Sequence, residues 1–192
     1  YNLGNAYFKL DELGKSILYY EKAKIITPRD YDLLHNLALA RGKIVDKDES
    51  EEAFLVVLVN YLMDKIALNE AAFIFLIFFS VFLLLSVVYP YYRHVSFIRR
   101  SYFYFVIPIL LCISVIFLYE YYDYEKNIQA IVLNPKIDVR SGPDEDFKIL
   151  FSIHEGTKVK IIKSNDVWVR ILLKNGLNGW VSFDSIGVIN PL

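Results

Sequence analysis

Two long stretches without a charged residue constrain this chain more than any other feature of its sequence. Residues 71–92 and 101–119 contain no Asp, Glu, Lys, Arg or His. A helix of about 20 consecutive apolar residues crosses the roughly 30 Å hydrocarbon core of a bilayer. The two stretches therefore predict a transmembrane helical hairpin, with one helix over 71–92 and a second over 101–119. They also account for the positive mean hydropathy, +0.34.

The loop between the two stretches, residues 93–100, indicates how such a hairpin would be oriented. It carries Arg93, Arg99 and Arg100 and no acidic residue, whereas both outer flanks of the hairpin are acidic. Short loops rich in Arg or Lys stay in the cytoplasm. We therefore expect a two-pass protein of the bacterial inner membrane with both soluble parts extracytoplasmic. Residues 48–70, an acidic run followed by a mostly apolar stretch, predict a linker and an interfacial helix.

Residues 1–47 have the periodicity of amphipathic helices. Apolar side chains recur three or four positions apart, which gives one apolar stripe per helix. Pro28 is expected to end the second helix, because proline cannot continue one. The segment also repeats itself, since Asn2-Leu3-Gly4 and Asn36-Leu37-Ala38 are 34 residues apart.

The large and small residues of this segment resemble the pattern of a tetratricopeptide repeat. The matching positions are Leu3, Gly4, Tyr7, Ser16, Tyr20, Ala23 and Pro28, followed by Leu34, Leu37 and Ala38. The resemblance implies the end of an α-solenoid, with one repeat plus the following helix, and further repeats before Tyr1. In this family an asparagine of the first helix often binds an extended peptide. Asn2 and Asn36 are therefore candidate peptide-binding residues, together with Asn5 and Lys9 on the same face. The alternative is that these asparagines are ordinary helix-surface residues.

Residues 128–192 lack the helical periodicity of the first segment. Their pattern predicts a small β-barrel of four or five strands. The β-branched or alternating stretches at 130–133, 158–163, 168–172 and 179–183 are separated by turn-forming Gly, Asn and Ser residues. Asn175-Gly176 predicts a hairpin with a type I′ turn, because both residues tolerate the positive φ angles of that turn.

The order of the motifs in this segment resembles a bacterial SH3 domain. The motifs are Ile137-Asp138-Val139-Arg140-Ser141-Gly142-Pro143, Glu155-Gly156-Thr157-Lys158-Val159, Trp168-Val169-Arg170-Ile171 and Asn175-Gly176-Leu177-Asn178-Gly179-Trp180-Val181. The resemblance implies a module that binds cell-wall peptides, glycan or partner proteins, with Arg140, Trp168 and Trp180 lining a groove. The alternative is that both tryptophans belong to the core of the barrel.

No catalytic, cofactor or metal site is predicted. His35, His94 and His154 lie in three different segments, and the chain has no Cys-x-x-Cys or His-x-x-x-His spacing. A Gly-rich phosphate loop and a Gly-x-Ser-x-Gly motif are also missing. The 21 basic and 22 acidic residues are spread along the chain, so the sequence has no basic cluster of the kind that binds nucleic acid. We therefore expect neither an enzyme nor a nucleic-acid-binding protein.

Together the segments predict a multi-domain α plus β membrane protein: the end of a tetratricopeptide solenoid, a transmembrane hairpin and an SH3-like barrel. This order resembles the BatE type of tetratricopeptide proteins of the Bacteroides aerotolerance operon. The resemblance implies a membrane-anchored scaffold with two extracytoplasmic protein-interaction modules. Its partners would be von Willebrand A-domain membrane proteins and a MoxR-type ATPase, in aerotolerance or envelope stress. The alternative is a cell-wall anchor that binds peptidoglycan through the SH3-like domain. Besides proteins, the lipid bilayer and peptidoglycan are thus the expected contacts.

Overall fold

The computed structural model describes residues 1–46, 68–92, 104 and 107–189. The chain divides into two compact units, one made of Tyr1–Lys65 together with Asn127–Leu192, the other of Ile66–Lys126. The predicted basic loop at 93–100 and most of the predicted linker and interfacial helix at 48–70 lie outside the described residues.

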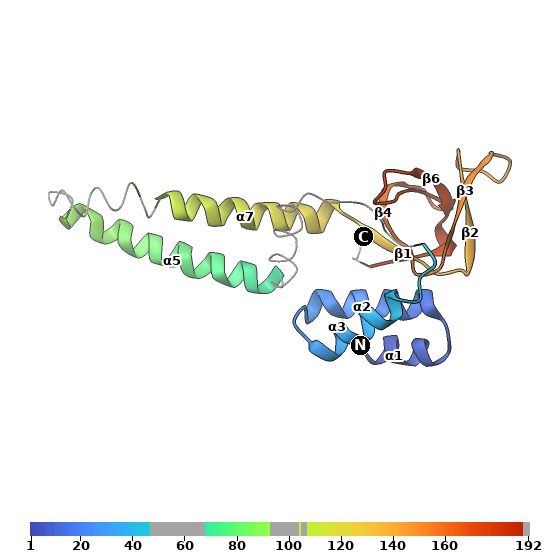
Figure 1. The fold of residues 1–192 in the computed structure, drawn as a ribbon. Helices are drawn as coiled ribbons and strands as arrows, with labels where there is room; N and C mark the ends of the chain where they lie inside the picture. The colour runs from blue at the N-terminus through green and yellow to red at the C-terminus, as the bar shows by residue number, and fades with distance from the viewer. Residues whose placement is uncertain (47–67, 93–103, 105–106, 190–192) are drawn as a thin grey trace. The chain divides into compact units, whose positions relative to one another are not determined.

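Three helices open the first unit: α1 (Asn2–Lys9), α2 (Leu13–Ile26) and α3 (Tyr31–Arg41) (Figure 1). Helix α2 contacts both α1 and α3. Pro28 follows the end of α2, as its sequence position predicts. The Asp30 carboxylate then accepts a hydrogen bond from the Leu33 backbone N–H at 3.0 Å. This satisfies one of the unpaired donors in the first turn of α3 and fixes where the helix begins.

Helix α2 packs against a β-sheet of the same unit, and this contradicts the predicted solenoid end. Ile17 and Leu18 of α2 form one buried cluster with Ile131 and Ile189, which lie on or beside the sheet. The approach is close at Gly14, where a Cβ atom would lie 2.5 Å from the backbone oxygen of Val132. A terminal repeat would cover this helix with a further helix of the array, whereas here strands close the apolar face. The prediction of a tetratricopeptide solenoid end over 1–47 is therefore wrong.

The sheet of the first unit has seven antiparallel strands in the order β3-β2-β6-β5-β4-β1-β7. The strands are β1 (Gln129–Val132), β2 (Lys136–Arg140), β3 (Ile149–His154), β4 (Lys158–Ser164), β5 (Trp168–Leu172), β6 (Asn178–Ser182) and β7 (Ile186–Val188). A short 3-10 helix, η2 (Phe183–Ser185), joins β6 to β7. The four stretches predicted as strands are β1, β4, β5 and β6. We call the whole assembly the curled sheet, with an inner face toward its core and an outer face away from it.

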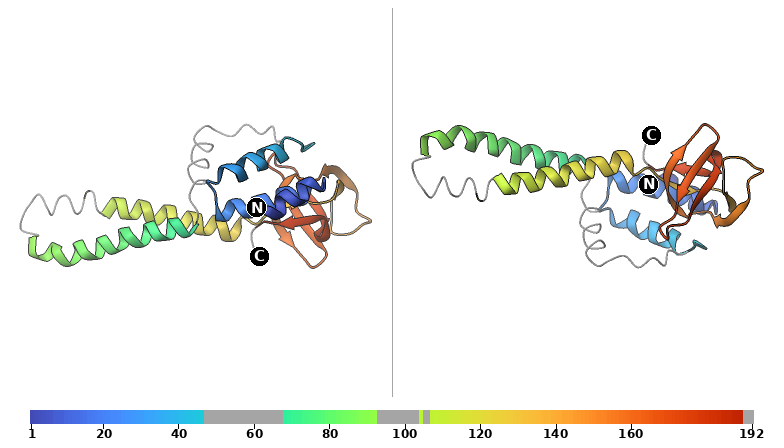
Figure 2. Two further views of the ribbon diagram at one scale, coloured as in Figure 1. Left: turned by 90° about the horizontal axis from the view of Figure 1, so that it is seen from below. Right: turned by 90° about the horizontal axis from the view of Figure 1, so that it is seen from above.

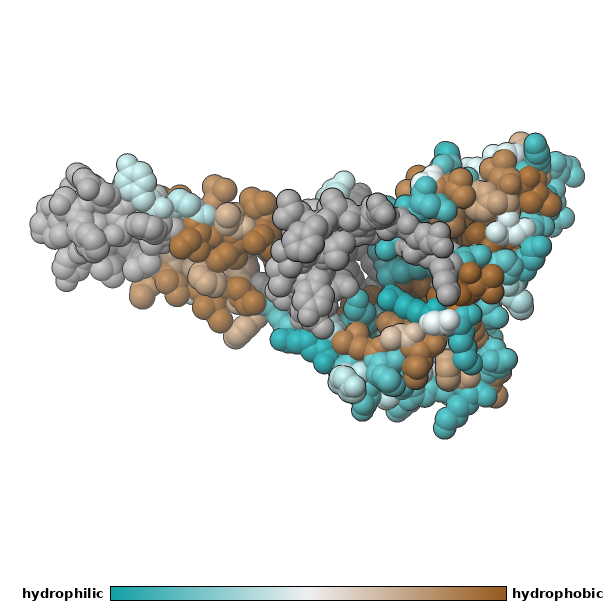
Figure 3. All heavy atoms as spheres, in the orientation of Figure 1, coloured by the Kyte–Doolittle hydropathy of each residue, from teal (hydrophilic) through white to brown (hydrophobic). Residues whose placement is uncertain are grey.

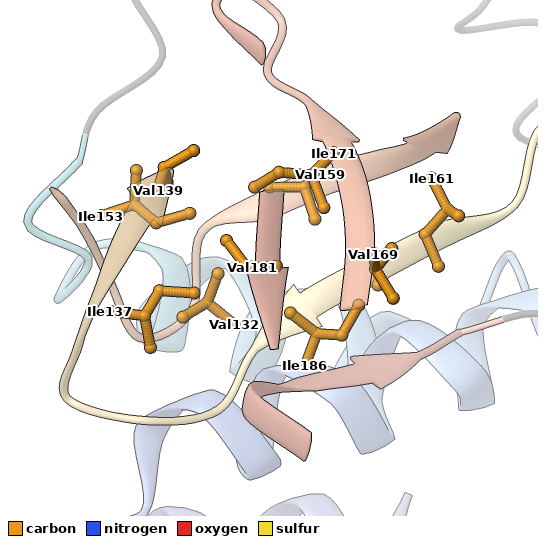
Figure 4. Close-up of a cluster of buried hydrophobic side chains, with 11 residues drawn as sticks. Val132, Ile137, Val139, Ile153, Val159, Ile161, Val169, Ile171, Val181 and Ile186 are labelled. Carbon is orange, nitrogen blue, oxygen red and sulfur yellow. The ribbon is translucent and has the colours of Figure 1, made fainter. Parts of the chain in front are cut away.

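β-branched side chains fill the inner face of the curled sheet. They come from all seven strands and converge in Figure 4, which labels Val132, Ile137, Val139, Ile153, Val159, Ile161, Val169, Ile171, Val181 and Ile186. Strand β1 is buried on both faces, because Ala130 and Val132 point to this core and Ile131 points to the helices. A strand covered on both sides is apolar at successive positions. This explains why buried and more exposed residues alternate along β2 and β5 but not along β1.

The hairpin predicted at Asn175-Gly176 is present, but its turn type differs from the prediction. Gly176 has φ +87°, whereas Asn175 does not share a positive φ angle. The Asn175 side-chain oxygen instead accepts a hydrogen bond from the Leu177 backbone N–H at 3.1 Å. A type I′ turn needs positive φ at both central residues, so that prediction is wrong. In this turn the asparagine contributes a side-chain hydrogen-bond acceptor, and the glycine adopts the positive φ angle.

The second unit consists of two helices, α5 (Leu68–Tyr92) and α7 (Ile107–Lys126), which run side by side in all three views (Figures 1 and 2). The Phe75 and Phe117 rings stack across the pair with centroids 5.1 Å apart. Several large apolar side chains remain more than half exposed, as the brown surface of this unit illustrates (Figure 3). They include Phe73, Leu76, Leu84, Leu111 and Leu118.

The helix pair does not confirm the predicted membrane hairpin. Among the described residues, no helix combines the length and the apolar character that crossing a bilayer requires. In α7 the part without acidic or basic residues ends before Glu120, after roughly 20 Å at about 1.5 Å per residue, short of a hydrocarbon core of roughly 30 Å. The finding contradicts the predicted transmembrane hairpin and the predicted two-pass location in the inner membrane. The fold class is instead a helical segment on an antiparallel sheet, with a separate helix pair.

Candidate functional site

The structure brings two of the four predicted peptide-binding residues together. The amide of Asn36 on α3 donates to the side-chain oxygen of Asn5 on α1 at 3.1 Å and to the Tyr1 hydroxyl at 3.0 Å. The same Asn5 oxygen accepts from the Tyr20 hydroxyl at 2.6 Å. Asn5 and Asn36 thus join α1, α2 and α3 to one another, and these contacts already use the Asn5 oxygen and the Asn36 amide.

The other two predicted residues of this face lie apart from that contact. Asn2 and Lys9 are exposed near opposite ends of α1. The contact between Asn5 and Asn36 stabilises the three-helix segment. Peptide binding there stays a prediction.

The two tryptophans lie on the outer face of the curled sheet, which contradicts the alternative that they are core. In β5 the buried residues are Val169 and Ile171, so Trp168 points outward. In β6 the buried residues are Gly179 and Val181, so Trp180 also points outward. Both indoles are half-buried. Since Trp168 lies opposite Ser182, two positions from Trp180, the two rings are diagonal neighbours on one face.

A row of directly opposed residues crosses this face over four strands. Lys163 of β4 pairs with Arg170 of β5, Arg170 pairs with Trp180 of β6, and Trp180 pairs with Arg140 of β2. Directly opposed residues in antiparallel strands point to the same side of a sheet. We call Lys163, Arg170, Trp180 and Arg140 the cationic row. With neighbouring strands about 4.8 Å apart, the row is roughly 14 Å long.

Sequence reasoning identified Arg140 and Trp180 but missed Lys163 and Arg170. Arg170 could have been found, because the alternation of Val169 and Ile171 places it on the same face as Trp168. Lys163 could not, because a β-bulge between Ile161 and Lys163 shifts the register of β4. If buried and exposed positions alternated strictly after the buried Ile161, the side chain of Lys163 would point inward. The bulge instead brings the exposed side chain of Lys163 beside Arg170.

Arg140 has a structural contact as well as a place in the cationic row. Its Nη1 donates to the backbone oxygens of Glu145 and Phe147 at 2.6 and 2.9 Å. These bonds hold the turn between β2 and β3, and they leave the Nε and Nη2 donors on the other edge of the guanidinium. The nearest outward acid on β2, Asp138, accepts a hydrogen bond from the Ser152 hydroxyl at 2.7 Å.

The helices cover a different part of the curled sheet, at β1 and β7, and two carboxylates join them to it, Glu21 buried and Asp46 partly exposed. Glu21 of α2 is 4% exposed, and Lys158 of β4 donates to it at 3.2 Å while Arg41 of α3 binds its other oxygen. Burial alone raises the pKa of the Glu21 carboxyl, but Lys158 and Arg41 outweigh burial and hold that pKa below its ordinary value. Glu21 therefore stays charged and links two helices to the sheet.

Asp46 forms the second link, between the segment after α3 and the curled sheet. It accepts hydrogen bonds from the His154 backbone N–H at 2.6 Å and the Thr157 hydroxyl at 2.9 Å, and its other oxygen lies 3.0 Å from His154 Nδ1. Burial raises the pKa of the Asp46 carboxyl, but these hydrogen bonds lower it by more. Glu155 adds a further contact, because its carboxylate accepts from the Gly14 backbone N–H at 3.1 Å near the start of α2.

The described residues contain no cluster of side chains suited to hold a metal ion. Across residues 1–46, 68–92 and 107–189, no group of three or more His, Cys, Asp or Glu side chains lies close enough to hold a metal ion. The expectations of no enzyme, no cofactor and no metal stay predictions. The candidate site is the outer face that carries the cationic row and both tryptophans.

These strands and motifs define a class of domain. Residues 135–186 match the bacterial SH3 domain family, which covers β2 to the start of β7. The chain thus carries a bacterial SH3 domain, as its motifs predicted. The match does not extend to the three helices or to the α5–α7 pair, so the predicted repeats, membrane anchor and BatE-type family find no support.

Two relatives each match only a part of this chain. Over 53 residues it is 34% identical to the Bacillus subtilis protein named "Putative N-acetylmuramoyl-L-alanine amidase YrvJ", which is 28% of this chain and 10% of that protein. The chain thus spans about a tenth of the length of this curated relative. A solved NlpC/P60 family protein from Bacillus cereus is 21% identical over 36% of this chain and 23% of its own, with a TM-score of 0.28. That likeness is too low to support an argument.

Proposed function

We propose that this protein associates with the bacterial cell wall by binding peptidoglycan through the outer face of its SH3 domain. The observation that carries the proposal is the face itself, on which both tryptophans of the chain lie beside three cationic side chains. Aromatic faces bind sugar rings and aliphatic segments, and guanidinium groups bind carboxylates. Peptidoglycan offers all three kinds of group.

The comparison with YrvJ supports the same ligand. The name of that protein assigns it to the bond between N-acetylmuramic acid and L-alanine, which is a bond of peptidoglycan. The region shared with this chain is a small part of that protein. We therefore transfer the ligand to this chain as a proposal and do not transfer the reaction.

Within the first unit, the outer face at β5, β6 and β2 is accessible, whereas the outer face at β1 and β7 is covered. Helix α2 covers β1 and β7, whereas Arg170 and Lys163 are exposed and both indoles are half-exposed. A ligand can therefore reach β5, β6 and β2 without displacing the helices.

Co-sedimentation of the full chain with purified sacculi tests the proposal. We expect the chain to pellet with sacculi and the Trp180→Ala variant to pellet several-fold less, since an aromatic contact contributes on the order of 1 kcal/mol. Tyr31→Ala, which removes an exposed aromatic side chain from α3, is the matched control and should pellet like the unchanged chain. A chain that stays in the supernatant at every sacculus concentration would refute the proposal.

The scaffold function inferred from the sequence is the second candidate. It requires a peptide groove on the helices, but the Asn36 amide donates to Asn5 and to the Tyr1 hydroxyl, and the Tyr20 hydroxyl donates to Asn5. No contact in the described residues favours a von Willebrand A-domain or MoxR-type partner. This role stays a prediction, and a pull-down with an Asn36→Ala variant would test it.

A further inference from the structure

The cationic row contains a local conflict that the fold alone does not require. Lys163 and Arg170 lie directly opposite each other on β4 and β5. Like charges in this position destabilise a sheet. Arg140 adds a third cation on the far side of Trp180, and the row itself contains no acid. A conflict between sequence and local structure is typical of a functional site, where a ligand supplies what the fold lacks.

We infer that the cationic row binds two carboxylates of a peptidoglycan stem peptide, one at Lys163 and Arg170 and the other at Arg140, with the intervening peptide over Trp180. This inference rests on the proposed function and names the chemical group that the SH3 domain recognises. One carboxylate between Lys163 and Arg170 turns a repulsive pair into two charge-assisted hydrogen bonds.

The spacing of the row selects the ligand. Arg170 and Arg140 are separated by two strand spacings, roughly 10 Å. An extended peptide advances about 3.3 Å per residue, so carboxylates about three residues apart match this distance. In a stem pentapeptide the free carboxylate of the second residue lies three residues before that of the last residue, and the extra methylene groups of its γ-linkage let the two carboxylates span this distance. The indole of Trp180 lies between the two cationic positions and provides an apolar surface for the side chains between them.

The donors of the row are placed for this role. Arg170 Nη2 donates to the Asn178 side-chain oxygen at 2.8 Å, which fixes one edge of its guanidinium and leaves the other edge for a carboxylate. Arg140 is fixed in the same way by its bonds to the turn between β2 and β3. Both guanidiniums are therefore held in position before a ligand arrives, which reduces the entropy lost on binding.

Tryptophan fluorescence reports on this site directly. The chain contains two tryptophans, Trp168 and Trp180, and both lie on the outer face. We would titrate the full chain with a synthetic stem pentapeptide and with the same peptide amidated at both carboxylates. We expect the acid form to bind and amidation to raise Kd about tenfold or more, since a hydrogen bond to a charged group contributes about 1.5–3 kcal/mol.

Variants assign the effect to the row. Arg170→Gln and Lys163→Gln should each raise Kd for the acid peptide about tenfold and should hardly change Kd for the amidated peptide. Lys136→Gln is the matched control, because Lys136 is an exposed lysine on β2 outside the row. It should leave Kd within about twofold. Equal urea midpoints for all variants would establish that they remain folded.

Different failures separate the inference from the proposed function. Equal binding of the acid and amidated peptides, or unchanged binding by both row variants, would overturn the inference while the chain still pellets with sacculi. Binding to poly(glycerol phosphate) but not to the pentapeptide would overturn it in favour of a phosphodiester polymer. Failure to pellet with sacculi would overturn the proposed function and the inference with it.

Discussion

Replacing Glu21 by glutamine tests whether a buried charge joins the helices to the SH3 domain. The carboxylate is 4% exposed and contacts Lys158 and Arg41, whose side chains are 39% and 46% exposed. Glutamine keeps the shape and can still form neutral hydrogen bonds, so the variant removes the charge and little else.

The expected loss of stability is the difference between several opposing effects. Two charge-assisted hydrogen bonds contribute about 1.5–3 kcal/mol each, and neutral replacements about 0.5–1.5 kcal/mol each. Glutamine also avoids the cost of burying a carboxylate, and water screens the two half-exposed cations. We therefore expect Glu21→Gln to reduce the free energy of unfolding by about 2 kcal/mol.

Urea denaturation at pH 7 measures this loss, with tryptophan fluorescence for the sheet and circular dichroism for the helices. At a slope of about 2 kcal/mol per molar urea, the midpoint should fall by about 1 M. Glu145→Gln is the matched control, because Glu145 is exposed in the turn after β2, and its midpoint should not move. A shift below about 0.2 M for Glu21→Gln would refute the role assigned to this carboxylate.

The pH dependence gives a second check on the same variant. The folded pKa of Glu21 is below its ordinary value of 4.5, so its contribution is complete above that value and disappears as the pH falls through the folded pKa. The difference between the unchanged chain and Glu21→Gln should therefore be constant near neutral pH and shrink below pH 4.5. A difference that persists unchanged in acid would mean that the charge is not responsible.

Two further variants test the contact between the helices and the sheet. Gly14→Ala should lower the free energy of unfolding by about 2 kcal/mol, because its Cβ would overlap the Val132 backbone oxygen. Gly42→Ala is the control in thermal unfolding, because no atom would come within 3 Å of its Cβ. Equal Tm values for the two variants would contradict the close approach at Gly14. Asp46→Asn should cost about 1–2 kcal/mol at pH 7 and progressively less below pH 3.8, since the lowered folded pKa of Asp46 stabilises the fold only while the carboxyl is ionised. A pH-independent difference in urea midpoint would show that the hydrogen bonds to His154 and Thr157 do not depend on that charge.

Local patterns predicted the local structure well. The alternation in residues 168–172 predicts a strand with the bounds of β5, and the stop at Pro28 agrees with the end of α2. The SH3 motifs also gave the correct domain, because they record turns and strand starts that lie close together in the sequence. The register of the cationic row depends on pairings between four strands and on a bulge, which no single stretch of sequence encodes.

The long-range contacts could not be predicted in the same way. Glu21 is 137 residues from Lys158, and Asp46 is 108 residues from His154. Nothing near Glu21 in the sequence distinguishes it from a solvated glutamate of an amphipathic helix. The same limit explains the error over the solenoid, because periodicity shows that α2 has an apolar face but not whether a helix or a strand covers it.

Because the first unit is assembled from two segments that lie on either side of the helix pair in the sequence, its order of synthesis differs from its order in space. Residues 1–46 emerge from the ribosome long before β1 and β7, against which α2 is buried. Until those strands exist, Ile17 and Leu18 have no sheet to pack against, and the Glu21 carboxylate lacks one of its two cations. Closing so long a loop is slow, and contacts between distant residues form late in folding. The nascent helices therefore lack this contact until β7 has been synthesised. If translation stops before β7, the helices have no complete sheet to pack against, and the sheet lacks its last strand.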